Sequence, residues 1–171
     1  LGAPIVIASR KPQHLDAGRA AIEAIGAPVL TVECDIREPA SIATFLFTDI
    51  EGSSRLWERE PAKMQLALAA HDRIARECVD GHQGRVLKMT GDGMCAVFAD
   101  PLDAIEATLD FQRALAGEQH ADGVELRARC GLHVGAAQRR DDDYFGGTLN
   151  RAARIMGTAH GGQVLLSQAV V

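Results

Sequence analysis

Two short apolar segments enclose a glycine-containing turn near the middle of the chain, and they constrain the fold more than any other feature. Residues 85–89 and 94–98 have the composition of strands, and Thr90-Gly-Asp-Gly93 between them is typical of a tight connection. A hairpin is therefore predicted over residues 85–98.

The segments on either side of this hairpin alternate between strand and helix patterns. From residue 44 onward the expected elements are, in order, a strand at 44–48, a helix at 61–79, the hairpin, a helix from 100, a strand at 125–137, a helix at 146–156 and a strand at 163–166. This order predicts an α+β fold whose sheet carries its helices on one face.

The first 43 residues have a different character. They predict a strand at 5–8, a helix at 15–25 and a strand at 29–32, which together form a partial Rossmann-like β-α-β segment. The motifs change near residues 38–41. We therefore expect a fragment over residues 1–43 and a second domain over residues 44–171.

Charge and cysteine content limit the function classes. The net charge of -5, without a long run of either sign, argues against a nucleic-acid-binding or anionic-membrane surface. No apolar stretch reaches the roughly 18 residues that a membrane-spanning helix needs, and the four cysteines form no CxxC pair. We expect a cytoplasmic protein with no nucleic acid or membrane among its partners.

Two aspartates stand where strands give way to turns. Asp49 ends a strand expected to be buried, and Asp92 lies in the glycine-flanked hairpin turn, where a backbone can approach closely. If the two converge, their oxygens suit magnesium or manganese rather than zinc. The alternative stays open that Asp49 caps the next helix and that Asp92 only serves the turn.

A polar turn follows Asp49 and opens a helical segment. Free backbone N–H groups in this turn could donate to phosphate oxygens; its residues are Glu51, Gly52, Ser53 and Ser54. An ordinary helix cap by Ser53 or Ser54 explains the same pattern. The chain has no GxxxxGK[ST] loop, which lowers the odds of an ordinary ATPase.

One predicted helix presents an amide and a guanidinium on the same side. Asn150 and Arg154 are four residues apart and share a face, whereas Arg151 points elsewhere. An arginine aimed at a reacting phosphorus stabilises phosphoryl-transfer charge, although exposed helical arginines usually meet only solvent. Arg129, on the long strand, either reaches terminal phosphates or faces solvent.

Lys88 and Asp143 form a candidate pair for reading a nucleotide base. Adenine presents an amino donor beside a ring-nitrogen acceptor, and a carboxylate with a lysine complements that pattern. Guanine has the opposite polarity at these positions. The alternative is a solvated lysine and one member of an acidic loop.

Taken together, these segments resemble the catalytic domain of class III nucleotidyl cyclases, the adenylyl and guanylyl cyclases. The resemblance covers about residues 42–171 and is carried by four stretches: Thr44-Phe-Leu-Phe-Thr-Asp-Ile-Glu-Gly-Ser-Ser54, Leu87-Lys-Met-Thr-Gly-Asp-Gly93, Arg129-Cys-Gly-Leu-His-Val-Gly135 and Asp143-Tyr-Phe-Gly-Gly-Thr-Leu-Asn-Arg-Ala-Ala-Arg154. It implies a ferredoxin-like βαββαβ nucleotide cyclase sheet. It also implies adenylate cyclase activity, in which ATP becomes 3′,5′-cyclic AMP and pyrophosphate by two-metal in-line attack.

The resemblance implies a role for each candidate residue. Two Mg²⁺ or Mn²⁺ ions would be held by Asp49, Asp92 and the carbonyl of Ile50. Lys88 and Asp143 would bind adenine, and the phosphates would be bound by Glu51, Gly52, Ser53, Ser54 and Arg129. Asn150 would orient the ribose, and Arg154 would stabilise the transition state. Sites of this family form at a head-to-tail homodimer interface, so two copies would share each site.

Two departures from the family pattern add expectations. Family domains usually continue past residue 166 with a helix and a closing hairpin that bears a phosphate-binding lysine, so we expect an incomplete C-terminal edge. Residues 5–36 resemble part of a short-chain dehydrogenase, with Arg10 and Asp35 as NADP contacts, but the glycine-rich loop and the Tyr-x-x-x-Lys pair are absent. Two alternative functions are a catalytically silent cyclase-homology dimerisation or regulatory module and an NADP-dependent reductase fragment.

Overall fold

The chain divides into two compact units, and each is described by itself. The computed structural model describes residues 5–9, 12–24, 26, 29–33, 40–118 and 124–170. The units are Leu1–Ala40 and Ser41–Val171. The division falls after Ala40 rather than after residue 43, and the strand expected to start at residue 44 already starts at Ala40.

The described residues of the first unit form two parallel strands and one helix. β1 (Ile5–Ser9) pairs with β2 (Val29–Glu33), and α1 (Pro12–Glu23) connects them in the chain. The strand-helix-strand order is the predicted one. Arg10 and Asp35, to which the dehydrogenase resemblance gives NADP contacts, lie outside the described residues.

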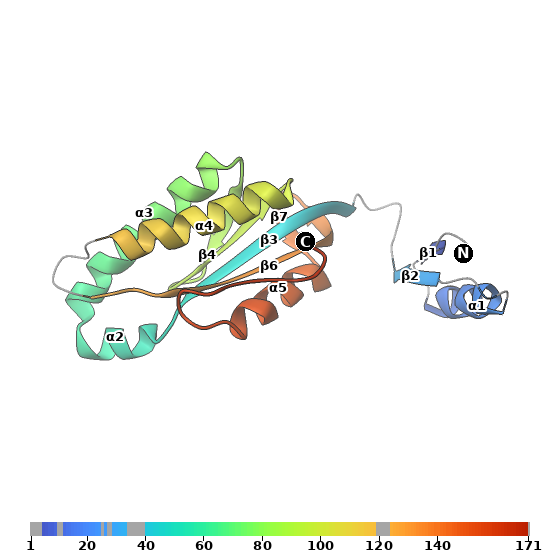
Figure 1. The fold of residues 1–171 in the computed structure, drawn as a ribbon, viewed down its shortest axis with the longest axis horizontal. Coiled ribbons are helices and arrows are strands. Elements are labelled where there is room, and N and C mark those ends of the chain that lie inside the picture. Colours follow the sequence, from blue (N-terminus) through green and yellow to red (C-terminus); the bar gives the residue numbers. More distant parts are fainter. Residues whose placement is uncertain are drawn as a thin grey trace. The chain divides into compact units, whose positions relative to one another are not determined.

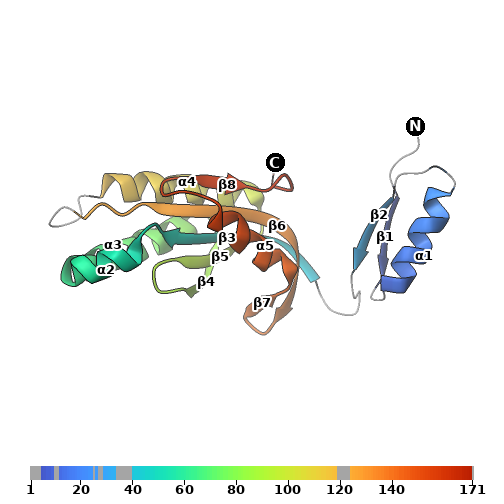
Figure 2. The same ribbon diagram turned by 90° about the horizontal axis from the view of Figure 1, so that it is seen from below.

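The second unit is built on one sheet (Figure 1). Its elements are β3 (Ala40–Ile50), α2 (Ser53–Arg59), α3 (Pro61–Gly81), β4 (Arg85–Met89), β5 (Met94–Phe98), α4 (Pro101–Gly117), β6 (Ala128–Arg140), β7 (Asp143–Phe145), α5 (Gly147–Gly157) and β8 (Val164–Leu166). The described strands follow the order β4-β5-β3-β6-β7, and β8 runs parallel beside β6 (Figure 2). β4 and β5 pair antiparallel, with Met89 opposite Met94, so the predicted hairpin is confirmed. The α+β fold class is confirmed as well.

The helix α2 begins in the polar turn after Asp49, as the helical segment expected there. One short element was not predicted, the strand β7 between the long strand β6 and the helix α5. β7 forms because the chain turns back at Asp141 and Asp142 and pairs antiparallel with the end of β6.

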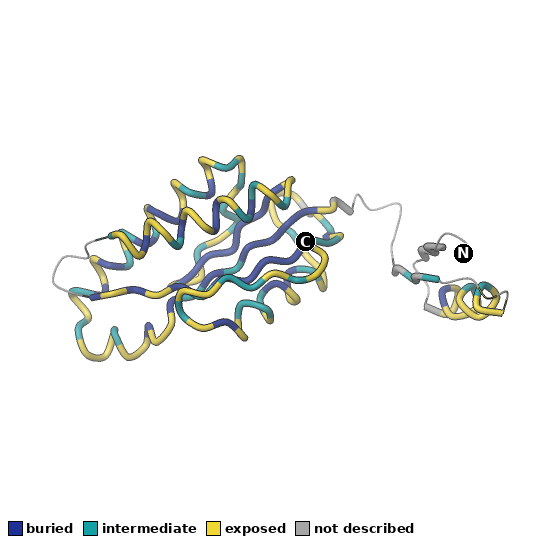
Figure 3. The backbone as a smooth tube through the Cα atoms, in the orientation of Figure 1, coloured by how far each residue is buried: buried dark blue, intermediate teal, exposed yellow. Residues whose placement is uncertain are grey.

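The helices α3 and α4 cover one face of the sheet. Leu46 and Ala96, on the central strands, pack there with Ile74 from α3 and Phe111 from α4. His71 is fully buried in the same layer, and its ring meets the Phe111 ring edge-on at 5.5 Å between centroids. Figure 3 shows the central strands buried along most of their length.

The helix α5 packs on the opposite face, so the expectation of helices on one face needs correction. Phe45 and Val97 face away from α3 and α4 and form a second, smaller core with Leu149 and Ala152 of α5. Figure 1 shows α5 across the sheet from α3 and α4. The sheet is therefore covered on both sides, as side chains that alternate along a strand permit.

Two glycines of β6 explain why α5 lies so close. Cys130 belongs to the α3 and α4 core, and the next residue, Gly131, faces α5. A Cβ atom on Gly131 would lie 2.3 Å from the main-chain nitrogen of Met156, and one on Gly135 would lie 3.0 Å from the Thr148 hydroxyl oxygen. Any larger side chain at these two positions would push α5 away from the sheet.

The helix α3, with 21 residues, is the longest described helix, but charged residues interrupt it. Over the described ranges, no helix combines the length and the apolar character that crossing a bilayer requires.

Replacing Gly131 by alanine tests the close approach of α5. We expect Gly131→Ala to lower the free energy of unfolding by about 1–3 kcal/mol, because the new methyl group overlaps the Met156 main chain. The control is Gly157→Ala at the end of α5, where nothing lies within 4 Å of the added atom. Urea unfolding measures both changes, and equal midpoints for the two variants would contradict the packing.

Candidate functional site

The end of β3 lies directly against the β4–β5 turn. The Ile50 N–H donates to the main-chain oxygen of Asp92 at 2.9 Å, and the Met94 N–H donates to the Thr48 hydroxyl at 3.0 Å. Gly93 fits here because a Cβ atom would lie 2.0 Å from the Thr48 carbonyl oxygen. These contacts bring the backbones of Asp49 and Asp92 together although the two residues come from separate elements.

Both aspartate side chains are bound by donors of the same chain. Arg129, on β6, donates from Nε to Oδ2 of Asp49 at 2.8 Å, and its Nη2 lies 2.5 Å from the same oxygen. The hydroxyl of Ser53, the first residue of α2, donates to Oδ2 of Asp92. Arg129 therefore does not face solvent alone, and Ser53 has a role that the sequence did not suggest.

The donor set at this corner fits a divalent cation that prefers oxygen ligands. It consists of the Asp49 and Asp92 carboxylates and the main chain of Ile50, whose side chain is buried in the core. Among the described residues no group of three or more His, Cys, Asp or Glu side chains could hold a metal ion. Two carboxylates and one carbonyl leave positions for water and phosphate, as Mg²⁺ and Mn²⁺ require.

The turn before α2 keeps only some of its expected free donors. Gly52 has φ 71°, a left-handed conformation that glycine adopts easily, and α2 starts at the next residue. The Glu51 N–H already donates to the Arg127 carbonyl at 2.9 Å, and the Glu51 carboxylate faces His160. The expectation of a free N–H at Glu51 is therefore wrong. In the described part of the chain, the N–H groups of Gly52, Ser53 and Ser54 have no such partner.

Lys88 and Asp143 act on the same buried thiol. Lys88 on β4 pairs with Cys95 on β5. Burial raises the pKa of Cys95 to about 12, while the charge of Lys88 lowers that pKa and the charge of Asp143 raises it. The two expected base-reading side chains thus lie within electrostatic reach of one point.

The hairpin of β6 and β7 reaches across the sheet to β4. Arg85 donates to the carbonyl oxygen of Asp142 at 3.2 Å, and its guanidinium lies 6.0 Å from the centre of the Tyr144 ring. β4 and β7 are at opposite ends of the strand order, so the hairpin must curl over the face of the sheet. A cavity of about 500 Å³ remains there, lined by Leu87, Asp141, Asp142, Asp143 and Phe145.

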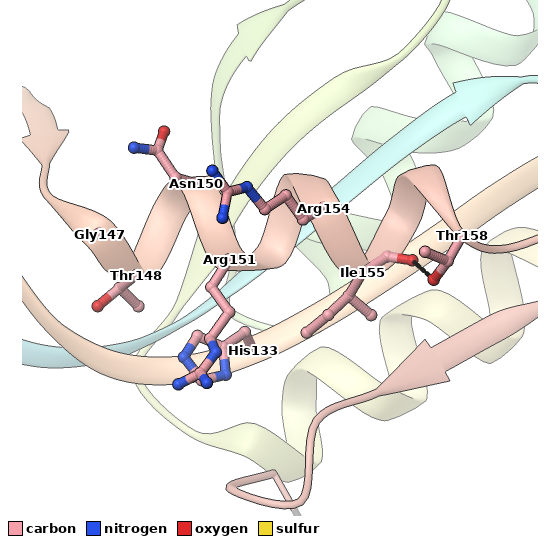
Figure 4. Close-up of a pocket in the computed structure, with 8 residues that line it drawn as sticks. All are labelled: His133, Gly147, Thr148, Asn150, Arg151, Arg154, Ile155 and Thr158. Carbon is pink, nitrogen blue, oxygen red and sulfur yellow. Dashed lines mark hydrogen bonds between the residues drawn. The ribbon is translucent and has the colours of Figure 1, made fainter.

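The helix α5 presents different residues on its two sides. Figure 4 shows Asn150 and Arg154 pointing to the same side, while Arg151 points the other way, toward His133. The predicted shared face is therefore confirmed. Neither Asn150 nor Arg154 has a hydrogen-bond or ion-pair partner among the described residues, and both line a cavity of about 830 Å³.

His133 is a residue of this cavity to which the sequence gave no role. It is buried, and its Nδ1 lies 2.7 Å from the Ser167 hydroxyl oxygen. Burial, and next the positive charge of Arg151, lower the pKa of His133. The signal that could have found it is the alternation along β6, because Arg129, Gly131, His133 and Gly135 all share the α5 face.

In the part of the chain that the structure describes, the expected site residues fall into groups that are not joined by hydrogen bonds or ion pairs. Within the described ranges, no hydrogen bond or ion pair joins Lys88, Asp143, Asn150 or Arg154 to the corner that holds Asp49, Asp92 and Arg129. One copy of the chain therefore leaves these groups unconnected.

Comparisons with known proteins agree on one family. The family model described as "Adenylate and Guanylate cyclase catalytic domain" matches residues 37–171. The uncharacterised protein Rv0891c of Mycobacterium tuberculosis is 39% identical over 133 residues, which is 77% of this chain and 44% of that protein. Putative adenylate cyclase 3 of Rhizobium meliloti is 37% identical over 133 residues, which is 75% of this chain and 22% of that protein. The chain thus spans less than half the length of either relative.

A solved structure has the same fold. It belongs to adenylate cyclases from Trypanosoma brucei in their monomeric state, with a TM-score of 0.72 and 28% sequence identity. The match covers 78% of this chain and 76% of that chain.

The surroundings of His133 generate a pH prediction. Because its pKa in the folded chain is lowered, the unfolded chain takes up the proton first as pH falls below about 6.5, and stability decreases from there until the folded pKa is passed. Arg151→Gln removes a charge that opposes protonation, so we expect the pKa of His133 to rise. NMR titration of the imidazole measures this, with the exposed Arg113→Gln as control. An unchanged His133 titration in Arg151→Gln would contradict the assignment.

Proposed function

From the premise that the chain belongs to the adenylate and guanylate cyclase catalytic domain family, we propose that it is an adenylate cyclase. It converts ATP into 3′,5′-cyclic AMP and pyrophosphate at a site shared by two copies. The observation that carries this proposal is the meeting of Asp49 and Asp92 where β3 ends against the hairpin turn. Relatives named adenylate cyclases, from Rhizobium meliloti and Trypanosoma brucei, support the choice of reaction.

Asp49, Asp92 and the Ile50 carbonyl would hold two Mg²⁺ or Mn²⁺ ions. When bound, such ions activate the ribose 3′-hydroxyl for in-line attack on the α-phosphorus and neutralise the departing pyrophosphate. The protein's part is to hold two carboxylates at a fixed separation. Ser53, the first residue of α2, supports this because its neutral hydroxyl donates a hydrogen bond to the Asp92 carboxylate.

The triphosphate would lie along the turn before α2. Gly52, Ser53 and Ser54 offer backbone N–H groups there, and Arg129 supplies a guanidinium from the neighbouring strand β6. Glu51 contributes the shape of the turn, since its own N–H is already bonded. A chain with a net charge of -5 binds a polyanion through these few local groups.

Lys88 and Asp143 would select adenine. Lys88 donates to the ring nitrogen and Asp143 accepts from the amino group, a pattern that guanine does not match. Both charges act on the pKa of Cys95, in opposite directions, so the two side chains lie in the neighbourhood of one thiol. The half-exposed Phe145, in the same cavity as Asp143, offers an apolar surface for a base.

Asn150 and Arg154 would act on the sugar and on the reacting phosphate. Both side chains are exposed, unpaired among the described residues and directed to one side of α5 (Figure 4). Asn150 orients the ribose, and Arg154 stabilises the negative charge that builds up on the α-phosphate in the transition state.

The separation of these groups within one copy favours a head-to-tail homodimer. In such a dimer one copy supplies Asp49 and Asp92, and its partner supplies the base-reading pair together with Asn150 and Arg154. Two equivalent sites then form across a two-fold axis.

A second candidate is a catalytically silent cyclase-homology module that dimerises or regulates. The observation in its favour is the ion pair of Arg129 with Asp49, which neutralises one expected metal ligand. Nucleotide binding without turnover would support this function over catalysis.

The activity itself can be tested with manganese and either nucleotide. We expect cyclic AMP from MnATP and much less cyclic GMP from MnGTP, with a rate that rises more than linearly with protein concentration. Asp49→Asn should lower kcat at least about 100-fold, because losing a metal ligand costs several kcal/mol of transition-state stabilisation. Asp80→Asn, at an exposed position near the end of α3, is the matched control. A dimeric wild-type protein without product would refute catalysis.

Mixing two inactive variants tests whether the site is shared. In an equal mixture of Asp49→Asn and Arg154→Ala, half of the dimers are mixed and one of their two sites is intact, so about one quarter of the wild-type activity should return. Mixing Asp49→Asn with Asp92→Asn should restore no activity. Each site takes both aspartates from one copy, so every site of a mixed dimer carries one of the two changes. Failure of the first mixture, with exchange of subunits verified, would contradict the shared site.

A further inference from the structure

The two expected metal ligands are held in chemically different ways. Arg129 contributes a positive charge to Asp49, whereas Ser53 contributes only a neutral hydroxyl to Asp92. The first carboxylate is neutralised by its partner, and the second keeps its full negative charge. The corner therefore presents one anion to an arriving cation rather than two.

The contact of Arg129 with Asp49 is close and partly shielded. Two nitrogens of the guanidinium meet the single oxygen Oδ2, and the side chains are 33% and 21% exposed. Asp49 is the one partner that Arg129 has in the described part of the chain. A cation that binds Asp49 would share this carboxylate with the guanidinium, and the repulsion between the two charges opposes its binding.

Two carboxylates beside the start of β6 already have positively charged or basic neighbours. The neighbouring Arg127 forms an ion pair with Glu125, and the Glu51 carboxylate lies near the His160 ring, which comes from another segment. Within the corner, the Asp92 carboxylate, which accepts from the neutral Ser53 hydroxyl, competes with Asp49 for Arg129. The polyphosphate of a nucleotide carries more negative charge than either aspartate, so it is the anion expected to draw Arg129 away from Asp49.

We propose that Arg129 is an exchangeable counterion that couples the binding of divalent cation to the binding of polyphosphate. Without nucleotide, Arg129 holds Asp49 and weakens cation binding there. When phosphate oxygens arrive, Arg129 moves to them, and Asp49 becomes free for the metal. Such coupling is reciprocal, so the cation and the polyphosphate strengthen each other's binding. This inference rests on the proposed metal site at Asp49 and Asp92.

The first test measures Mn²⁺ binding alone, by the loss of the free-ion electron paramagnetic resonance signal. Arg129→Gln should bind Mn²⁺ at least about tenfold more tightly than the wild type, because a like charge next to the ligand is gone. The control is Arg127→Gln, which removes the same charge two residues away. Because the Arg127 guanidinium is paired with Glu125, this change should alter the Mn²⁺ affinity little. Arg129→Lys keeps the positive charge, so its Mn²⁺ affinity should be close to that of the wild type.

The second test measures the binding of inorganic tripolyphosphate by calorimetry, with a chelator present to exclude metal. Asp49→Asn releases Arg129 and should tighten binding about tenfold. Asp92→Asn removes an equal charge but leaves Arg129 on Asp49, so its gain should be smaller. In the double variant Asp49→Asn, Arg129→Gln the gain should disappear, as a double-mutant cycle requires for direct coupling.

The outcomes separate this inference from the function on which it rests. If Asp49→Asn weakens Mn²⁺ binding but Arg129→Gln does not strengthen it, the metal site stands and the counterion exchange is overturned. If Asp49→Asn leaves Mn²⁺ binding unchanged in the Arg129→Gln background, where no guanidinium competes for the carboxylate, the proposed metal site itself fails, and the exchange fails with it. Equal tripolyphosphate gains in Asp49→Asn and Asp92→Asn would overturn the exchange as well.

Discussion

A main-chain hydrogen bond between Ile50 and Asp92 is the contact on which the site depends. It ties the end of β3 to the β4–β5 turn, and Gly93 permits the close approach by lacking a side chain. Because the bond joins main-chain atoms, it does not depend on which groups the neighbouring carboxylates bind. The backbones that carry the two acidic side chains are thereby kept together, and Arg129 reduces the repulsion between the carboxylates by pairing with Asp49.

The two faces of the sheet have different roles: one forms most of the core, and the other carries the site residues. Leu46 and its neighbours on one face support the large core under α3 and α4, so that side is committed to packing. The other face carries the small core under α5 and, along the alternating positions of β3 and β6, the side chains of Asp49 and Arg129. Gly131 lets α5 pack close to this face of the sheet, and this distance fixes how far from the sheet Asn150 and Arg154 lie.

Charge in the site is balanced locally rather than by the surface as a whole. The guanidinium of Arg129 offsets Asp49, while Arg154 and Lys88 carry charges with no such ion pair in the described ranges. The acidic chain as a whole would repel a nucleotide, so the energy of binding has to come from these few cations and from the metal ions that the carboxylates attract. Small rearrangements of one arginine can then change the affinity for both cation and phosphate.

Local patterns in the sequence were sufficient for part of this arrangement. The hairpin over residues 85–98 follows from two apolar segments and the glycines between them, and the shared side of Asn150 and Arg154 follows from helical periodicity. The family resemblance pointed to Asp49 and Asp92 as partners. Each of these predictions uses residues only a few positions apart or a motif recognised as a unit.

The tertiary structure alone decided the rest, because it depends on which strands become neighbours. Arg129 meets Asp49 across 80 residues of sequence, and Ser53 meets Asp92 across 39. The position of α5 on the second face was missed, since the alternation of Gly131 and Gly135 has meaning only once β6 lies inside the sheet. By itself the sequence determined which side chains were available for the chemistry, and the pairing of strands determined which of them touch.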